Sequence, residues 1–355
     1  MRNLHIPSRS PAYAKNAMVS TSHPDATKKA LEIMEKGGNA FDAAISAAAI
    51  LGVVEAHSTG IGGDCFCIFY SQKENKVKAI NGSGTAISSI DYNKVKVTEN
   101  NTVDPYCPDA VTVPGAVAAW IRINQDYGSV PMKDLLTPAI NLAENGYIVA
   151  DVIADMWKRE TAKLEKDKDC KNVFLKGNKP YLAGDLHFQQ ALGKTLREIA
   201  KSGKEGFYDG WVAEDIVGKL NSIGGKHTLN DFSNLNIEYV EPVSSSYRGY
   251  DVYECPPNGQ GIVALMILNL LQEFDLSSID PDSFERVHLE AEASKIAFHH
   301  RNKYLGDPKF SDIPVQKLLS REYAKKLSKM ISFKETIKEL EVYPLNNNKD
   351  TVYIS

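Results

Sequence analysis

The sequence has no long hydrophobic run. Its longest apolar stretch, Ala43 to Val54, is twelve residues long and contains Ser46 as its one polar member, whereas a membrane-spanning helix needs about 20 apolar residues. The first twenty residues carry scattered Arg, His, Pro and Ser without an apolar core, unlike a secretory signal. The sequence as given therefore predicts a cytoplasmic protein that is not embedded in a membrane.

An excess of charge of one sign is also lacking, and cysteine is sparse. The 41 Lys and Arg residues against 45 Asp and Glu residues give a net charge of −4, so electrostatics offers no reason to expect nucleic acid or an anionic membrane as a partner. The five Cys residues are an odd number and are scattered, which argues against a disulfide framework. Internal repeats and low-complexity tracts are missing too, and 355 residues suffice for one large core or two smaller ones.

The chain is organised around its Ala-rich run. Asn39 can cap a helix, and Asp42 three residues later resembles the capping box. The helix that follows is apolar on every side, so we expect other elements to cover several of its faces. A glycine-rich turn at 59–63 leads into two predicted strands, 65–71 and 76–81. The first of them is apolar on both faces, which predicts a central position in a sheet.

Helices dominate the remainder of the sequence. Periodic apolar patterns bounded by Gly, Pro or Asn predict a first helix that begins within 22–25 and reaches about 36, and a second that follows 111–115 and ends near 127–128. Further helices are predicted over 131–145, 152–168, 185–202, 210–222, 262–274, 281–304 and 320–330. A strand pair is predicted over 237–243 and 247–255. Strands near the start and helices beyond them indicate an α/β or α+β fold.

Two local patterns invite a chemical interpretation. The glycine-rich turn 59–63 could cradle a phosphate, but a nucleotide-binding loop follows a strand and opens a helix, whereas this turn follows a helix and precedes a strand. A structural turn is the favoured interpretation. Cys65 and Cys67 point to one side of a strand and could bind a metal, but no matching second pair follows. Core packing is favoured for both residues.

A third pattern lies on the long helix predicted over 281–304. His288, Glu292 and His299 share one of its faces at spacings of four and seven residues. These spacings match no metal-binding motif, so the metal hypothesis is weaker than the simpler explanation, exposed helix polarity. Thr351, taken alone, is an ordinary strand residue.

Several short strings along about 330 residues match one family in their order and spacing. In the first part of the chain they are Ser22-His23-Pro24-x-Ala26-Thr27, Gly37-Gly38-Asn39-Ala40-x-Asp42-Ala43-Ala44, Leu51-Gly52-Val53-Val54-Glu55 and Ser58-x-Gly60-Ile61-Gly62-Gly63. Further along they are Val113-Pro114-Gly115, Tyr127-Gly128, Pro138-Ala139-Ile140-x-x-Ala143-Glu144-x-Gly146, Gly206-Phe207-Tyr208 and Leu305-Gly306-Asp307-Pro308. With these strings the sequence resembles the gamma-glutamyltransferase (gamma-glutamyltranspeptidase) family.

The resemblance implies an N-terminal-nucleophile hydrolase with a four-layer αββα sandwich, made as a precursor that cuts itself in two. Residues 1–350 would form the large-subunit region, and residues 351–355 would begin the small subunit. The catalytic Thr of the family falls on Thr351, and the self-cleavage site falls on the Asp350–Thr351 bond. The implied partners are a gamma-glutamyl or related acyl amide, such as a glutathione-like compound, and the chain's own small subunit. No cofactor and no metal are implied.

The position of Thr351 makes chemical sense within that resemblance. A Thr hydroxyl is a poor nucleophile near neutral pH and needs a base beside it. Cleavage of the Asp350–Thr351 bond would free the α-amine of Thr351, and an α-amine has a pKa near neutrality. The amine could then accept the hydroxyl proton while Oγ attacks an amide carbonyl. In the family the donors that hold the oxyanion come from the small subunit.

The sequence departs from the family pattern at three places. Members that act on glutathione usually carry an Arg after the second hairpin strand, where it grips the α-carboxylate of the glutamyl group, but Ser83 stands there in this sequence. Val352-Tyr353 replaces a frequent Thr-His pair, and the sequence ends four residues after Thr351. We therefore expect an incomplete sandwich, because most of the small subunit is absent. Two alternatives follow from the departures: a divergent acylase with non-glutamyl substrates, and a truncated relative without catalytic activity.

Overall fold

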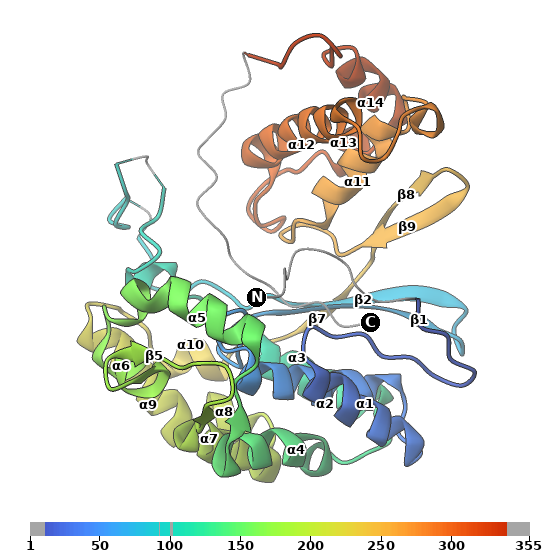
Figure 1. Ribbon diagram of the computed structural model, residues 1–355. Helices are drawn as coiled ribbons and strands as arrows, with labels where there is room; N and C mark the ends of the chain where they lie inside the picture. The colour runs from blue at the N-terminus through green and yellow to red at the C-terminus, as the bar shows by residue number, and fades with distance from the viewer. Residues whose placement is uncertain (1–10, 92, 100–101, 339–355) are drawn as a thin grey trace. The chain divides into compact units, whose positions relative to one another are not determined.

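The computed structural model describes residues 11–91, 93–99 and 102–338 (Figure 1). These residues fall into two compact units. Within the described residues, the first unit comprises 11–64 and 84–236, and the second comprises 65–83 and 237–338. The hairpin predicted to follow the Ala-rich helix therefore belongs to a different unit from that helix.

The first unit consists mainly of helices. Its elements in chain order are α1 (Pro24–Glu35), α2 (Ala40–Val54), the 3₁₀ turn η1 (Pro108–Ala110), α3 (Ala116–Tyr127), α4 (Met132–Asn145), β3 (Tyr147–Ile148), α5 (Asp151–Leu164), α6 (Lys168–Phe174), β4 (Leu175–Lys176), β5 (Lys179–Pro180), β6 (Leu186–His187), α7 (Gln190–Ser202), α8 (Glu205–Tyr208), α9 (Trp211–Ser222) and α10 (Leu229–Ser233). The short strands pair only as β3 with β6 and β4 with β5 within the part of the chain that the structure describes.

The Ala-rich helix α2 forms as predicted. The side chain of Asn39 accepts hydrogen bonds from the backbone N–H groups of Phe41 and Asp42, and Asp42 accepts one from the backbone of Asn39 at 2.9 Å. This reciprocal capping box satisfies donors that a helix start would otherwise leave open. α1, α3 and α4 pack against the helix, and Ile50 and Leu51 are fully buried. The helix is apolar all round because its neighbours enclose it.

The second unit contains the sheet. Its elements are β1 (Cys65–Ser71), β2 (Lys76–Gly82), β7 (Glu238–Val240), β8 (Val243–Tyr247), β9 (Tyr250–Glu254), α11 (Gly261–Leu271), η2 (Leu276–Ser278), α12 (Phe284–Tyr304), α13 (Val315–Leu318) and α14 (Arg321–Ser328). Figure 1 shows α11, α12 and α14 packed together. Their buried core includes Leu270, Leu289, Ile296 and Leu327.

The antiparallel hairpin of β1 and β2 is confirmed, but the predicted central position of β1 is wrong for the described residues. The strand order is β1-β2-β7, so β2 is the central strand and β1 lies at an edge. Phe66, Ile68 and Tyr70 on one face of β1 are 38%, 37% and 53% exposed. The apolar residues of β1 therefore line one partly buried face and one exposed face of the strand.

The predicted second strand pair is shifted along the chain. β8 pairs with β9, and β7, which precedes them, joins β2 instead. Arg248 and Gly249, expected at the start of a strand, form the turn between β8 and β9 with φ angles of 51° and 89°. A two-residue hairpin loop favours positive φ at both positions, which glycine adopts at little cost.

None of the helices that the structure describes is long and apolar enough to cross a membrane.

Candidate active site

Ser83, which stands where the family resemblance implies an Arg, is part of a small polar network in the second unit. Its backbone N–H donates to the Oδ1 atom of Asn81 at 3.0 Å. Asn258, in the turn before α11, donates from Nδ2 to the Oγ atom of Ser83 at 3.0 Å. Asn81 donates from its own Nδ2 to the Oδ1 atom of Asn258 at 2.8 Å. Three neutral side chains thus connect the end of β2 with the turn before α11, and none of them offers a charge to a substrate carboxylate.

Asn258 is the residue of this network that the sequence did not single out. The string Pro256-Pro257-Asn258-Gly259 has the composition of a turn, and nothing local indicates which distant loop the Asn258 amide contacts. Gly259 helps to bring that turn close: a Cβ added there would lie 3.3 Å from the Cε1 atom of Phe66 on β1. The only local signal was the accumulation of Asn and Gly in both loops.

The next residue, Gly84, fixes the backbone beyond the network. Its φ is +78°, and a Cβ at this position would lie 1.9 Å from the carbonyl oxygen of Val113. Thr85 then pairs with Val113 in an isolated bridge, in which the N–H of Val113 donates to the carbonyl of Thr85 at 2.8 Å. Only glycine permits both the positive φ and this close approach.

The glycine-rich turn 59–63 has a structural role in the described residues. The carbonyl oxygen of Gly63 accepts hydrogen bonds from the N–H groups of Gly115 and Ala116 at 3.0 and 3.1 Å. A carbonyl therefore occupies the start of α3, where a phosphate-binding loop would leave N–H groups available to an anion. This geometry supports the structural turn over phosphate binding.

The two strand cysteines show no sign of a metal site. Burial raises the pKa of the Cys67 thiol to about 11, as expected for a cysteine in apolar surroundings. Among the described residues, no group of three or more His, Cys, Asp or Glu side chains is arranged to hold a metal ion.

The polar residues on α12 have a different role from the one the sequence favoured. His288 and Glu292 are 9% and 2% exposed, so exposed helix polarity is the wrong explanation for them. The Nε2 atom of His288 lies 2.7 Å from the carbonyl oxygen of Ser332. Glu292 accepts a hydrogen bond from the backbone of Ile337 at 2.9 Å and pairs with Lys295 at 2.9 Å. These side chains hold the segment that follows α14.

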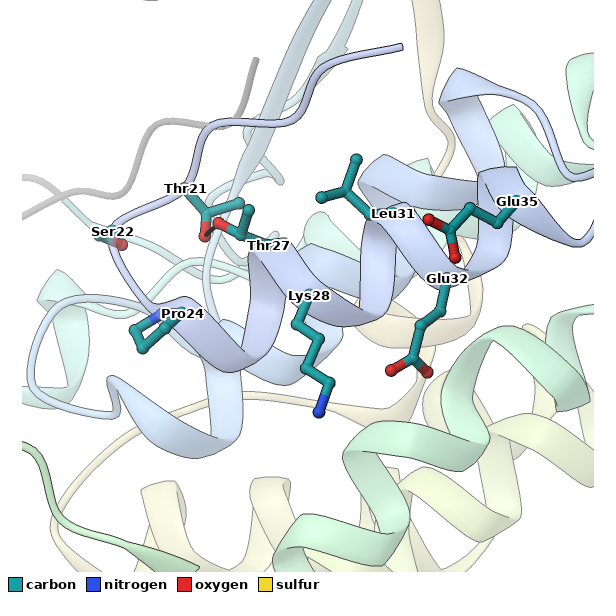
Figure 2. A pocket seen from close by; sticks show the side chains of 8 residues that line it. All are labelled: Thr21, Ser22, Pro24, Thr27, Lys28, Leu31, Glu32 and Glu35. Atoms are coloured by element: carbon teal, nitrogen blue, oxygen red, sulfur yellow. Dashed lines mark hydrogen bonds between the residues drawn. The ribbon is translucent and has the colours of Figure 1, made fainter. Parts of the chain in front are cut away.

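A surface hollow of about 790 Å³ lies along α1. Figure 2 shows that all of its lining side chains come from α1 and the residues just before it. None of the residues that the sequence analysis proposes as catalytic, substrate-binding or metal-binding is among them. Asp350 and Thr351, the predicted cleavage site and nucleophile, lie outside the described residues.

Comparison with known proteins gives one consistent result. The gamma-glutamyltranspeptidase family profile matches residues 26–355. A glutathione hydrolase-like proenzyme of Bacillus subtilis, YwrD, is 37% identical over 318 residues, which cover 89% of this chain and 60% of the relative. The chain thus spans about 60% of the length of this curated relative.

Solved structures agree. The gamma-glutamyltranspeptidase of Helicobacter pylori superposes with a TM-score of 0.84 and 31% identity, over 96% of this chain and 100% of the matched chain. The cephalosporin acylase of Bacillus halodurans superposes with a TM-score of 0.83 and 37% identity, over 93% of this chain and 62% of the acylase. These structures share the N-terminal-nucleophile hydrolase fold, and the expected α/β class is confirmed. The chain therefore belongs to the gamma-glutamyltranspeptidase family.

Proposed function

We propose that this chain belongs to a self-processing amidohydrolase or acyltransferase in which Thr351 is the nucleophile. The observation that carries the proposal is the family match, which continues to residue 355 and so runs through the Asp350–Thr351 bond. Proteins described as proenzymes are among the relatives, which supports cleavage of a precursor. In this proposal residues up to 350 form one subunit, Thr351 begins the other, and the protein acts in the cytoplasm.

The proposed reaction needs no cofactor. After cleavage, the free α-amine of Thr351 takes the proton of its own hydroxyl while Oγ attacks the carbonyl carbon of an amide. The C–N bond breaks, the amine leaves with that proton, and the acyl group remains as an ester on Thr351. Water or a second amine then attacks the ester, and its proton returns to Oγ. The first acceptor gives hydrolysis and the second gives transfer.

Mass spectrometry of the full-length protein tests the proposal. Wild type should yield two fragments that meet at the Asp350–Thr351 bond, and Thr351→Ala should remain a single intact chain. Thr351→Ser is the matched control, because it keeps a hydroxyl and should still be cleaved. Equal cleavage of wild type and Thr351→Ala would refute the role of Thr351.

A second candidate is an acylase that takes acyl groups without an α-carboxylate. The neutral Asn81–Ser83–Asn258 network favours it, because a bidentate Arg–carboxylate contact is charge-assisted and its loss weakens binding of a charged acyl group. A cephalosporin acylase and a protein described as an acylase proenzyme are among the similar proteins. Gamma-glutamyl amides and uncharged acyl amides are therefore the two substrate classes to compare.

A further inference from the structure

His187 on β6 lies inside an aromatic cage. The side chain is 0% exposed, and four aromatic rings surround it. The ring centroids lie 4.6 Å away for Tyr181, 5.0 Å for Trp157, 5.5 Å for Tyr147 and 6.0 Å for Phe174. The cage residues come from β3, α5, α6 and the loop after β5, so the imidazole is where these elements meet.

The imidazole has no polar partner in this cage. Neither ring nitrogen of His187 has a hydrogen-bond partner among the described residues. Gln189, the amide that follows on the same segment, donates from Nε2 to the carbonyl of Val53. A buried polar group without a partner is costly, and a buried charge without a partner is far more costly. The site tolerates a neutral imidazole and rejects an imidazolium.

Among the residues that the structure describes, no carboxylate is placed to stabilise a proton on His187. The other titratable side chains in the cage are the phenols of Tyr147 and Tyr181. Asp185, two residues before His187, directs its carboxylate to the Nζ atom of Lys176 and the N–H of Leu182, both at 2.9 Å. Burial lowers the pKa of His187 to about 4, in agreement with a cage that contains no charge.

The cage also forms the core of a segment whose contacts with the rest of the first unit include a cation–π contact, in which the Nζ atom of Lys166 lies 3.8 Å from the centroid of the Tyr106 ring. Residues 147–187, which we call the cage segment, contain two sheets of only two residue pairs each. Its helix α5 packs mainly on α6 and β5, which belong to the same segment. An exposed cluster, in which Lys219 of α9 pairs with Asp167 and Asp169 at 2.8 and 2.6 Å, connects it to the rest of the unit. Exposed pairs of this kind contribute little stability.

We propose that His187 controls the opening of the cage segment in response to pH. When the solution becomes acidic, protonation of His187 opens the cage segment while the rest of the protein stays folded. The opened segment exposes His187 to water, where the imidazolium is solvated. This device acts in the first unit and is independent of the enzymatic role proposed above.

The sign and size of the effect follow from proton linkage. A histidine with a lower pKa in the closed form than in the open form binds its proton preferentially in the open form, so acid favours opening. Stability is complete above the ordinary pKa near 6.5 and is lost as the pH falls toward 4. Between pH 7 and pH 5 the opening equilibrium should rise about twentyfold.

Hydrogen-exchange mass spectrometry of the full-length protein at pH 7, 6 and 5, corrected for intrinsic exchange rates, measures the opening. Peptides from 147–187 should show the twentyfold rise, and peptides from α11, which has no titratable side chain, should show none. In His187→Phe, which keeps an aromatic ring, the pH dependence should disappear. His227→Gln is the control, because His227 is also buried in the first unit and its replacement should leave the rise unchanged.

An NMR titration of histidine-labelled wild type keeps the proposal testable even if His187→Phe fails to fold. The His187 signal should titrate well below pH 6 in the folded protein. A midpoint at or above 6.5, or an unchanged pH dependence of exchange in His187→Phe, would overturn the proposal.

Discussion

Tyr208 illustrates how one side chain can join distant parts of the sequence. Its hydroxyl donates to the carbonyl of Pro114 at 2.6 Å and accepts from the N–H of Ala118 at 3.1 Å. The strings 113–115 and 206–208, which both contribute to the family resemblance, thus meet in the first unit. Asp42 acts similarly, because its carboxylate accepts from the Ser129 hydroxyl at 2.6 Å. Tyr208 and Asp42, which both belong to these strings, therefore make structural contacts inside the first unit.

The glycine after Ser83 allows a test at the scale of one residue. Gly84→Ala should destabilise the protein by about 2 kcal/mol or more, because a left-handed residue gains a Cβ that collides with the Val113 carbonyl. Urea denaturation measures the loss. Gly62→Ala is the matched control: a Cβ at Gly62 meets nothing within 4 Å and its φ is not positive, so its effect should be small. A loss for Gly62→Ala as large as that for Gly84→Ala would contradict this explanation.

At the scale of elements, α12 has two roles. It packs in the core of the second unit, and its polar side chains form hydrogen bonds with the segment that follows α14. Its apolar side chains Leu289, Ala293 and Ile296 join the core of the second unit. Its buried carboxylate Glu292 holds Ile337 and pairs with Lys295. The same helix therefore packs against the core and fixes the segment that follows α14.

Glu292→Gln should loosen that segment. Burial acts to raise the pKa of Glu292, but the hydrogen bonds from Lys295 and Ile337 outweigh it and leave the pKa below its ordinary value. A carboxyl group with a lowered pKa stabilises the folded state above its ordinary pKa of about 4.5 and loses this contribution as the pH falls through the lowered value. The substitution should cost about 1–2 kcal/mol near pH 7, and this cost should fade in acid. Urea denaturation at pH 7 and at pH 3 measures both effects.

Glu290→Gln on the same helix provides the control for this prediction. Glu290 pairs with Arg286 one turn away, but its side chain is 47% exposed, so the same substitution should cost about 0.5 kcal/mol or less. Equal costs for the two variants would show that Glu292 contributes no more than a surface ion pair. A cost for Glu292→Gln as large at pH 3 as at pH 7 would show that the contribution does not come from the ionised carboxylate.

Local sequence signals predicted the individual helices and strands better than they predicted which other elements lie next to them. The cap at Asn39, the apolar run and the two strands of the hairpin are encoded in neighbouring residues, and the structure confirms them. The edge position of β1 depends on β7, which lies some 170 residues further along the chain, so no local pattern contains it. The hydrogen bond between Glu292 and Ile337 likewise joins residues 45 positions apart. In the candidate site, Ser83 was identified from the family resemblance, whereas Asn258 could be identified only from the three-dimensional structure.

At the scale of the whole molecule, the chain order and the spatial order differ. The hairpin of β1 and β2 follows α2 directly in the sequence but pairs with β7, and so joins the unit formed by residues 237–338. Ser83 lies at the end of that inserted hairpin and Asn258 lies in the later part of the same unit. Because the two loops meet only after the second unit has folded, the substrate preference attributed to them depends on the fold of that unit and not on either loop alone.

That preference can be tested with three anilides on the complete two-subunit protein. Glutaryl and butyryl groups both lack the α-amine of a gamma-glutamyl group, but the glutaryl group keeps the carboxylate. If the neutral network lines the acyl pocket, wild type should turn over glutaryl and butyryl anilides with similar kcat/KM. Ser83→Arg should raise kcat/KM for the glutaryl and gamma-glutamyl anilides about tenfold and leave the butyryl anilide unchanged, because the new cation contacts only a carboxylate.

Two further variants separate this effect from general changes. Ser83→Ala removes the Oγ atom that accepts from Asn258 without adding charge, so it should not favour carboxylated substrates. Ser246→Arg adds the same cation at an exposed position on β8 of the same unit and should leave all three rates unchanged. The proposed preference is wrong if wild type already favours carboxylated anilides strongly and Ser83→Arg brings no gain. A cation from another part of the protein would then already serve the carboxylate, and the gamma-glutamyl class would be the better description of its substrates.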